Sequence, residues 1–168
     1  KQIIMIKYNT QIGARNLNQI SLRILKKKNG LRINVKCRIY RLQLGNNVKI
    51  ALITDTHFGA RNDSTPFLDY FDKFYSEVFF PSLDDNNIDC IVHLGDIVDR
   101  RKYISYVTLR RMKAMFIDQC EKRNIDLHII IGNHDVPFRN TNEINSMKEL
   151  FQNTSVNYYS NPETVKFG

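Results

Sequence analysis

Three short polar clusters interrupt the apolar pattern in the middle and later part of the chain. They read DTHFG at 55–59, GDIVD at 95–99 and GNHD at 132–135, and each directly follows a run rich in apolar residues. The clusters combine carboxylate, amide and imidazole groups and contain no cysteine. This donor set favours manganese, iron or catalytic zinc over a structural zinc site. The clusters therefore predict a metal site, provided that they meet in space.

The residue types also predict how the ligands would be shared between two metal ions. Asp55 and His57 are alternate residues at a strand end, so their side chains can hold one ion together. A carboxylate has two oxygens, so Asp96 can bridge two ions, and Asn133 adds a ligand without charge. Two ions about 3.5–4 Å apart can activate a water and hold the attacking and leaving oxygens of a displacement. His134 is expected to donate to a phosphate oxygen or a leaving group.

The apolar runs before the clusters predict the strands that position them. Residues 48–53, 88–94 and 127–131 are expected to be strands, and the last of these runs resembles a parallel strand that is covered on both faces. The carboxyl ends of parallel strands lie at one edge of a sheet, where open α/β folds bind ligands. The intervals of 41 residues from Asp55 to Asp96 and 37 from Asp96 to Asn133 each fit one crossover unit. The clusters are therefore expected to converge.

Helical periodicity fills the intervals between these strands. Ser64 or Thr65 is expected to cap a helix with Pro66 near its first position. The apolar stripe of that helix is expected to face the core; it comprises Phe67, Tyr70, Phe71, Phe74, Tyr75, Val78 and Phe79. Further helices are expected over about 107–123 and 143–151, and further strands over 156–159 and 164–167. This order predicts an α/β fold with a mostly parallel sheet flanked by helices.

Charge is distributed unevenly along the chain. Residues 1–50 hold 12 Lys or Arg and no acidic residue, which leaves 13 basic and 17 acidic residues for 51–168. We place a boundary at residues 45–47, between a basic leader over 1–47 and a domain over 48–168. Residues 31–40 alternate between apolar and largely cationic positions, which predicts one strand. A nucleic-acid-binding ribbon, a solvated edge strand and a leader foreign to the domain are alternative interpretations.

The composition excludes several classes of protein. The hydrophobic share of 42% is ordinary for a globular domain. The sequence contains no run of about 18 apolar residues, so no membrane span is predicted. The N-terminus does not show the pattern of a secretory signal. Cys37, Cys90 and Cys120 are widely spaced and odd in number, which is typical of reduced thiols. We therefore expect a cytoplasmic protein that does not associate with membranes.

The three motifs, in this order and spacing, resemble those of the calcineurin-like metallophosphoesterases, and the resemblance covers about residues 48–168. It implies a layered α/β fold. It implies that Asp55 and His57 bind the first metal, that Asp96 bridges, and that Asn133 binds the second metal. It also implies two divalent ions, usually Mn²⁺, with Fe²⁺, Zn²⁺ and Mg²⁺ as alternatives.

The same resemblance implies roles for three further residues. His134 would assist catalysis, and Asp135 would lie behind it and hold its ring. Asp99 would be structural or would support a ligand without binding metal itself. The family pattern continues with further histidines after GNHD, which this chain lacks. We therefore expect the N-terminal part of the domain, with the second half of its sandwich absent, weak metal binding and little turnover.

Two longer stretches resemble one particular group within this family. HLGDIVDRRKYIS at 93–105 and VNYYSNPETVKF at 156–167 are similar to SbcD-type DNA double-strand-break-repair nucleases, especially phage recombination endonuclease subunits. This implies a metal-dependent DNA exonuclease or endonuclease subunit in a bacterial or phage-infected cell. It also implies a homodimer that works with an SMC-like, ABC-type ATPase.

Other interpretations stay open on the sequence alone. A phosphatase or small-molecule phosphodiesterase could use the same ligands, and a non-catalytic module could hold nucleic acid through its leader. His93 and His128 lie within strands and are expected to be packed and hydrogen-bonded. The basic run 100–102 could contact a DNA backbone or form a solvated loop, and we assign no DNA-binding residue.

Overall fold

The computed structural model describes residues 2–6, 17–21, 38–44 and 48–167, and a six-stranded sheet is the centre of the fold. Its strands follow the order β2-β3-β4-β5-β6-β7. Their bounds are β2 Leu17–Ser21, β3 Arg38–Leu44, β4 Val48–Ile53, β5 Cys90–His93, β6 Asp126–Ile130 and β7 Asn157–Tyr159. β4 to β7 are parallel, whereas β2 and β3 are antiparallel to their neighbours. The predicted α/β fold with a mostly parallel sheet is confirmed.

The register brings three strand ends to the same level. Ile53 of β4 pairs with His93 of β5, and His93 pairs with Ile129 of β6. Because the three strands run in the same direction, the chain leaves each of them at one edge of the sheet. The polar clusters that follow these strands therefore start side by side.

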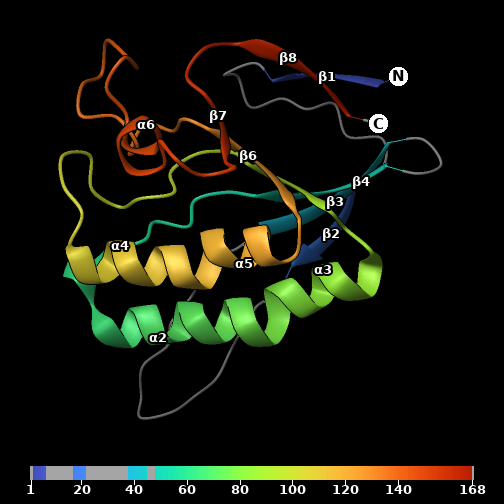
Figure 1. The fold of residues 1–168 in the computed structure, drawn as a ribbon, viewed down its shortest axis with the longest axis horizontal. Coiled ribbons are helices and arrows are strands. Elements are labelled where there is room, and N and C mark those ends of the chain that lie inside the picture. Colours follow the sequence, from blue (N-terminus) through green and yellow to red (C-terminus); the bar gives the residue numbers. More distant parts are fainter. Residues whose placement is uncertain (1, 7–16, 22–37, 45–47, 168) are drawn as a thin grey trace.

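Two helical segments cover one face of the sheet (Figure 1). The first runs from α2 through the π-helical turn η1 to α3, and the second from α4 through η2 to α5. Their bounds are α2 Thr65–Phe74, η1 Tyr75–Phe79, α3 Phe80–Asn86, α4 Tyr106–Met112, η2 Lys113–Ile117 and α5 Asp118–Lys122. A short helix α1, Ala60–Asp63, precedes α2, and α6, Ser146–Leu150, precedes β7. None of the helices in the described ranges is long and apolar enough to cross a bilayer.

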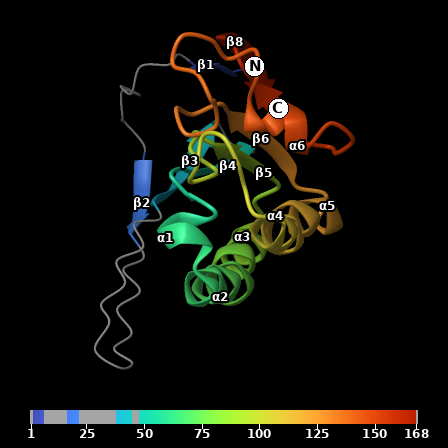
Figure 2. The same cartoon turned by 90° about the vertical axis from the view of Figure 1, so that its left-hand side faces the viewer.

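The alternating faces of the strands supply two apolar clusters. Ala51, Ile53 and Ile91 point into the larger cluster, which they share with the helices. Ile50 and Leu52 point the other way, into a smaller cluster with Phe167 of β8. β8, Glu163–Phe167, pairs with β1, Gln2–Ile6, as a separate antiparallel ribbon on the side of the sheet away from α2 to α5 (Figures 1 and 2). Burial on both faces explains why β4 and β5 are nearly continuous apolar runs.

The aromatic stripe forms the helical side of the core, as predicted, with one exception. Phe79 is fully buried, and Tyr75 packs against Phe116 of the second helical segment at a ring-centroid distance of 5.2 Å. Tyr70 is 40% exposed, so its predicted place in the stripe is wrong. Leu68 and Phe71, which are two positions before Tyr70 and one position after it, are buried. Residues one or two positions apart on a helix lie on different faces, so Tyr70 faces away from the core.

Several predicted boundaries shift. The strand expected over 31–40 is described only over Arg38–Leu44, because residues 31–37 lie outside the described ranges. β3 is also an interior strand, paired with β2 and β4, so the solvated-edge interpretation of its position is wrong. The helix expected from residue 143 begins only at Ser146, since the side chain of Asn145 caps it by accepting from Lys148 N at 2.9 Å. The boundary at residues 45–47 stays a prediction.

We predict that Phe116→Ala destabilises the fold by about 3–5 kcal/mol, because it leaves a cavity beneath both helical segments. The free energy of unfolding measured in urea tests this. Tyr106→Ala is the control, since its side chain in the same helical segment is 89% exposed and its loss should cost less than about 0.5 kcal/mol. Equal losses for the two variants would contradict this description of the core.

Candidate metal centre

Asp55, His57 and Asp96 come together at the carboxyl edge of the sheet. One ligand atom from each lies within 4.8 Å of those of the other two. The backbone aligns the two loops, because Asp55 N donates to Gly95 O at 3.2 Å and His57 N donates to Asp96 O at 3.0 Å. The predicted convergence of the first two motifs is therefore present in the fold.

The local conformation of these residues differs from the expected one. Asp55, His57 and Asp96 have φ values of 54°, 44° and 56°, in the left-handed region. The two residues of the first motif are thus in a tight turn and not at alternate positions of an extended strand. Left-handed conformations cost non-glycine residues roughly 1–3 kcal/mol and tend to cluster at functional sites. The surrounding hydrogen bonds must hold these conformations in place.

Two glycines let the second and third strand ends approach closely. A Cβ on Gly95, where φ is 100°, would lie 2.8 Å from the Cα of Gly132. A Cβ on Gly132 would overlap the backbone nitrogen and a carboxylate oxygen of Asp96. The glycines predicted to permit close backbone approach therefore do so, and the approach sets where the Asp96 carboxylate lies.

Asn133 lies beside Asp96, as a shared metal centre requires. The two ends of its amide are 3.3 Å from Asp96 Oδ2 and 3.1 Å from Arg101 Nη2. Without a cation, hydrogen bonding turns the NH₂ toward Asp96 and the oxygen toward Arg101. A cation reverses that preference, since it attracts both the amide and the carboxylate oxygen. The donor set of Asp55, His57, Asp96 and Asn133, oxygen plus imidazole, fits a divalent metal.

His134 is oriented by a backbone carbonyl. Its Nδ1 lies 2.6 Å from Asp99 O, and its backbone N donates to Asp96 Oδ1 at 2.8 Å. A carbonyl oxygen only accepts, so Nδ1 carries the proton and Nε2 remains for another partner. The ring meets that of His57 edge to face at a centroid distance of 4.8 Å. His134 is therefore close to the ligand cluster and has one nitrogen free of the Asp99 contact.

Asp99 contacts both site histidines. Besides its carbonyl contact with His134, its Oδ1 lies 3.7 Å from His57 Nδ1, a distance longer than a hydrogen bond. His57 Nδ1 is buried and has no hydrogen-bond partner among the described residues. His57 Nε2 faces Asp55 Oδ1 at 3.7 Å. If Nε2 binds a cation, Nδ1 carries the proton, and the Asp99 carboxylate is the group placed to accept a hydrogen bond from it, in the arrangement common for metal-bound histidine.

Asp135 does not hold the His134 ring, contrary to the expectation from the motif. Its fully buried carboxylate accepts four backbone N–H groups. Oδ2 accepts from Asp96 N and Gly132 N, both at 2.8 Å, and Oδ1 accepts from Ile97 N at 3.0 Å and Val98 N at 3.2 Å. Burial raises the pKa of Asp135, while these N–H bonds favour the ionised form. Asp135 therefore fastens the GDIVD loop to the GNHD loop, and the ring-holding contact belongs to Asp99.

The two remaining histidines are packed and hydrogen-bonded, as predicted. Gly95 N donates to His93 Nδ1, so His93 Nε2 carries the proton and donates to Thr56 Oγ1 at 3.0 Å. Burial, and then the charge of His57, lowers the pKa of His93 to about 3, so this residue is neutral at physiological pH. His128 contacts Tyr159 Oη at 2.6 Å and Asp126 Oδ2 at 2.8 Å. Neither histidine belongs to the ligand cluster.

The basic run 100–102 is not simply a solvated loop. Arg100 forms an ion pair with Asp63 Oδ2 at 3.0 Å and lies over the ring of Tyr103. Arg101 reaches the amide of Asn133. Sequence reasoning missed this contact, and the only available signal was that Arg101 follows the second motif by two residues.

We predict that Asp135→Asn lowers the free energy of unfolding by about 2–4 kcal/mol. An amide has one acceptor oxygen where the carboxylate has two, so buried N–H groups lose their partner. Thermal and urea unfolding measure the loss. Asp85→Asn, at an exposed position of α3, is the matched control and should be neutral. A neutral result for Asp135→Asn would show that the four contacts do not hold the two loops.

The chain is similar to several known proteins. The sequence model of the family described as calcineurin-like phosphoesterase matches residues 48–167. The chain is 34% identical over 83 residues to exonuclease subunit 1 of Enterobacteria phage T4, a match that covers 49% of this chain and 24% of that protein. The crystal structure of Pseudomonas putida nuclease MPE aligns with a TM-score of 0.45 and 15% identity, over 86% of this chain and 60% of that one.

The chain spans less than two thirds of the length of both relatives. The family match itself covers most of the chain and includes all three motifs. It begins with β4 and ends with β8, and so contains the parallel sheet, the helices and the ligand cluster. The chain belongs to the calcineurin-like phosphoesterase family.

Proposed function

We propose that this chain takes part in metal-dependent hydrolysis of DNA phosphodiesters, as part of an exonuclease or endonuclease. The observation that carries the proposal is the meeting of Asp55, His57 and Asp96 within 4.8 Å, with the His134 ring against that of His57. The phosphoesterase family supports the reaction class. The similarity to a phage exonuclease subunit supports DNA as the substrate over a small phosphate ester.

The residues that would hold metal divide into two groups. Asp55, His57 and Asp96 would hold the first ion, and Asp96 and Asn133 would contribute to the second. Bound divalent metal, most favourably Mn²⁺, would supply Lewis-acid activation of water and of the phosphoryl oxygens. The described residues give the first position three ligands and the second only two. The first position should therefore bind more tightly.

The protein's own groups would do the remaining work. The Asp99 carbonyl holds the Nδ1 proton of His134, which aims Nε2 away from that contact. When the imidazole is protonated, Nε2–H can donate to the leaving oxygen of the phosphodiester. The N–H of His134 and the carboxylate of Asp135 keep the Asp96 loop in place during this transfer.

The wider assembly is also part of the proposal. Similarity to an exonuclease subunit supports a role beside further subunits, and we propose an SMC-like, ABC-type ATPase and a second copy of the chain as partners. Such a complex would act in double-strand-break repair or phage recombination in the cytoplasm.

We predict that the chain binds Mn²⁺ weakly, with one ion dominating, because only the first position has three ligands. Isothermal titration calorimetry gives the stoichiometry and affinity. Asp96→Asn should weaken binding by about 100-fold or more, beyond the effect typical of residues behind the ligands. Asp85→Asn should not change it. Tight binding of two ions per chain, or unchanged binding by Asp96→Asn, would contradict the ligand assignment.

We predict that His134→Gln slows Mn²⁺-dependent cleavage of end-labelled DNA by about 10²–10⁴-fold, because glutamine cannot protonate a leaving oxygen. Hydrolysis of bis(p-nitrophenyl) phosphate should fall much less, since p-nitrophenolate leaves without a proton. Wild-type rates are expected to be slow, so both assays use high protein concentration and long incubation. Equal losses on the two substrates would assign His134 to binding and not to proton transfer.

A further inference from the structure

A polar pocket is lined by residues that follow the GNHD motif in the chain, and it has no place in the chemistry described above. It has a volume of about 790 Å³ and is bounded by the loop 139–143, by Lys148 of α6, by Tyr158 of β7, and by Ser160 and Asn161 after β7. Every one of its side chains can form hydrogen bonds. A wall without purely aliphatic side chains suits a ligand rich in polar groups and does not suit an apolar segment of a protein partner.

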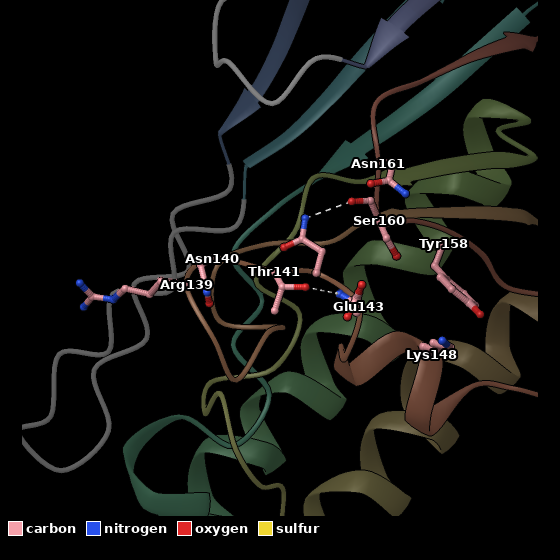
Figure 3. A pocket seen from close by; sticks show the side chains of 9 residues that line it. Arg139, Asn140, Thr141, Glu143, Lys148, Tyr158, Ser160 and Asn161 are labelled. Atoms are coloured by element: carbon pink, nitrogen blue, oxygen red, sulfur yellow. Dashed lines mark hydrogen bonds between the residues drawn. The ribbon is translucent and has the colours of Figure 1, made fainter.

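The pocket offers three kinds of contact. Lys148 and Arg139 are cationic, and Glu143 is the single acidic residue of the lining. Three lining residues are asparagines. Asn142 is hydrogen-bonded within the wall, whereas the amides of Asn140 and Asn161 can donate and accept at once and can pair with the edge of a base. Tyr158 packs on the core and is half-buried, so part of its ring remains for stacking. Figure 3 shows Lys148 and Tyr158 at one end of the pocket and Arg139 at the other.

The walls of the pocket are fastened to one another. Asn142 Nδ2 donates to Ser160 O at 3.0 Å, which ties the loop to the segment after β7 (Figure 3). Asn145 is 1% exposed; its Nδ2 donates to Asn142 O and Ser160 Oγ, and its Oδ1 caps α6. A pocket held in this way is preorganised, and less conformational entropy is lost when a ligand binds.

Asp135 links the pocket to the metal centre. Its carboxylate holds the Asp96 loop, and its carbonyl oxygen accepts from Ser146 N at 2.8 Å, at the start of α6. Arg139 is the fourth residue after Asp135, so the pocket loop begins within about 14 Å of Asp135. At about 3.4 Å per nucleotide of a stacked strand, that upper limit corresponds to at most about four nucleotides.

We propose that this pocket is a nucleotide subsite, in which Lys148 contacts a phosphate, the amides contact a base edge and Tyr158 stacks on the base. The inference rests on the proposed function, because it places the nucleotide in the strand whose phosphodiester is cleaved. The same chemistry also suits a free nucleoside monophosphate released by cleavage, and the experiment separates the two sources.

The test measures binding in EDTA, where metal and cleavage do not contribute. The ligands are a fluorescein-labelled hexadeoxynucleotide, followed by anisotropy over a range of salt concentrations, and 5′-dAMP, followed by calorimetry. Lys148→Gln removes a cation, and Asn161→Asp places a carboxylate among the amides with almost no change of shape. Their matched controls are Lys73→Gln on α2 and Asn153→Asp, both at exposed positions outside the pocket. Thermal unfolding confirms that all four variants are folded.

We expect each pocket variant to weaken hexanucleotide binding by about five- to tenfold. Lys148→Gln should also lower the salt dependence, the slope of log K against log salt, by about 0.7, the value for one contact to a single strand. The two controls should stay within about twofold. Tight binding of 5′-dAMP that both pocket variants abolish would assign the pocket to the free nucleotide; its failure to bind would assign the pocket to the strand.

Photocrosslinking locates the bound strand independently of affinity. An oligonucleotide that carries 5-iodouracil should crosslink to Tyr158, and the product should persist in Tyr158→Phe and disappear in Tyr158→Leu. The proposal is overturned if pocket variants and controls bind alike and crosslinks map only to residues outside the pocket. Mn²⁺ binding that is lost in Asp96→Asn would then still support the proposed function, so the two failures can be distinguished.

Discussion

The candidate site depends on one buried carboxylate. Asp135 accepts four backbone N–H groups from the turns after β5 and β6, and these turns carry Asp96, Asn133 and His134. An ionised carboxylate is costly to bury, and hydrogen bonds to a charged group contribute only about 1.5–3 kcal/mol each. Four such bonds are of the size needed to offset that cost. The arrangement orders two loops with little net gain in stability, which is reasonable for a residue whose role is positioning.

The ligand residues need such support because their backbone is strained. Asp55, His57 and Asp96 all have left-handed φ values, and each would be more stable in another conformation in an isolated peptide. Hydrogen bonds between the loops oppose this preference. The backbone N–H groups of Asp55 and His57 donate to the carbonyls of Gly95 and Asp96, and the backbone N–H of Asp96 donates to the Asp135 carboxylate. Metal ligands held in this way need little reorganisation when an ion binds, which favours catalysis by preorganised groups.

Asp135 also forms a hydrogen bond through its backbone carbonyl. Its side chain orders the metal centre, while its carbonyl fixes the start of α6 and so one wall of the polar pocket. A substrate strand that contacted both places would be held at two points that Asp135 connects. Asp99 likewise uses both its backbone and its side chain, since its carbonyl orients His134 while its carboxylate faces His57. In both residues the backbone and the side chain serve different parts of the site.

Much of the fold and of the ligand set could be predicted from the sequence alone. The continuous apolar runs of β4 and β5, the spacing of the motifs and the helical stripe are local signals. They indicated a parallel sheet whose polar ends converge, and the structure brings Asp55, His57 and Asp96 together there. The nature of the donor groups, oxygen and imidazole without thiolate, also follows directly from residue identity.

Other features depended on contacts that no local pattern encodes. The sequence indicated an alternating strand end for Asp55 and His57, but the fold places both in a left-handed turn because backbone bonds to Gly95 and Asp96 outweigh the intrinsic preference. Adjacency in GNHD suggested that Asp135 would hold His134, yet successive side chains point in different directions. The Asp135 carboxylate instead accepts three backbone N–H groups of the other loop and that of Gly132 in its own loop. The sequence by itself determined which chemical groups the site contains and at which edge of the sheet they gather. Only the tertiary structure decided which partner each group has, because hydrogen bonding between loops about 40 residues apart depends on how the strands align and not on the order of residues within a motif.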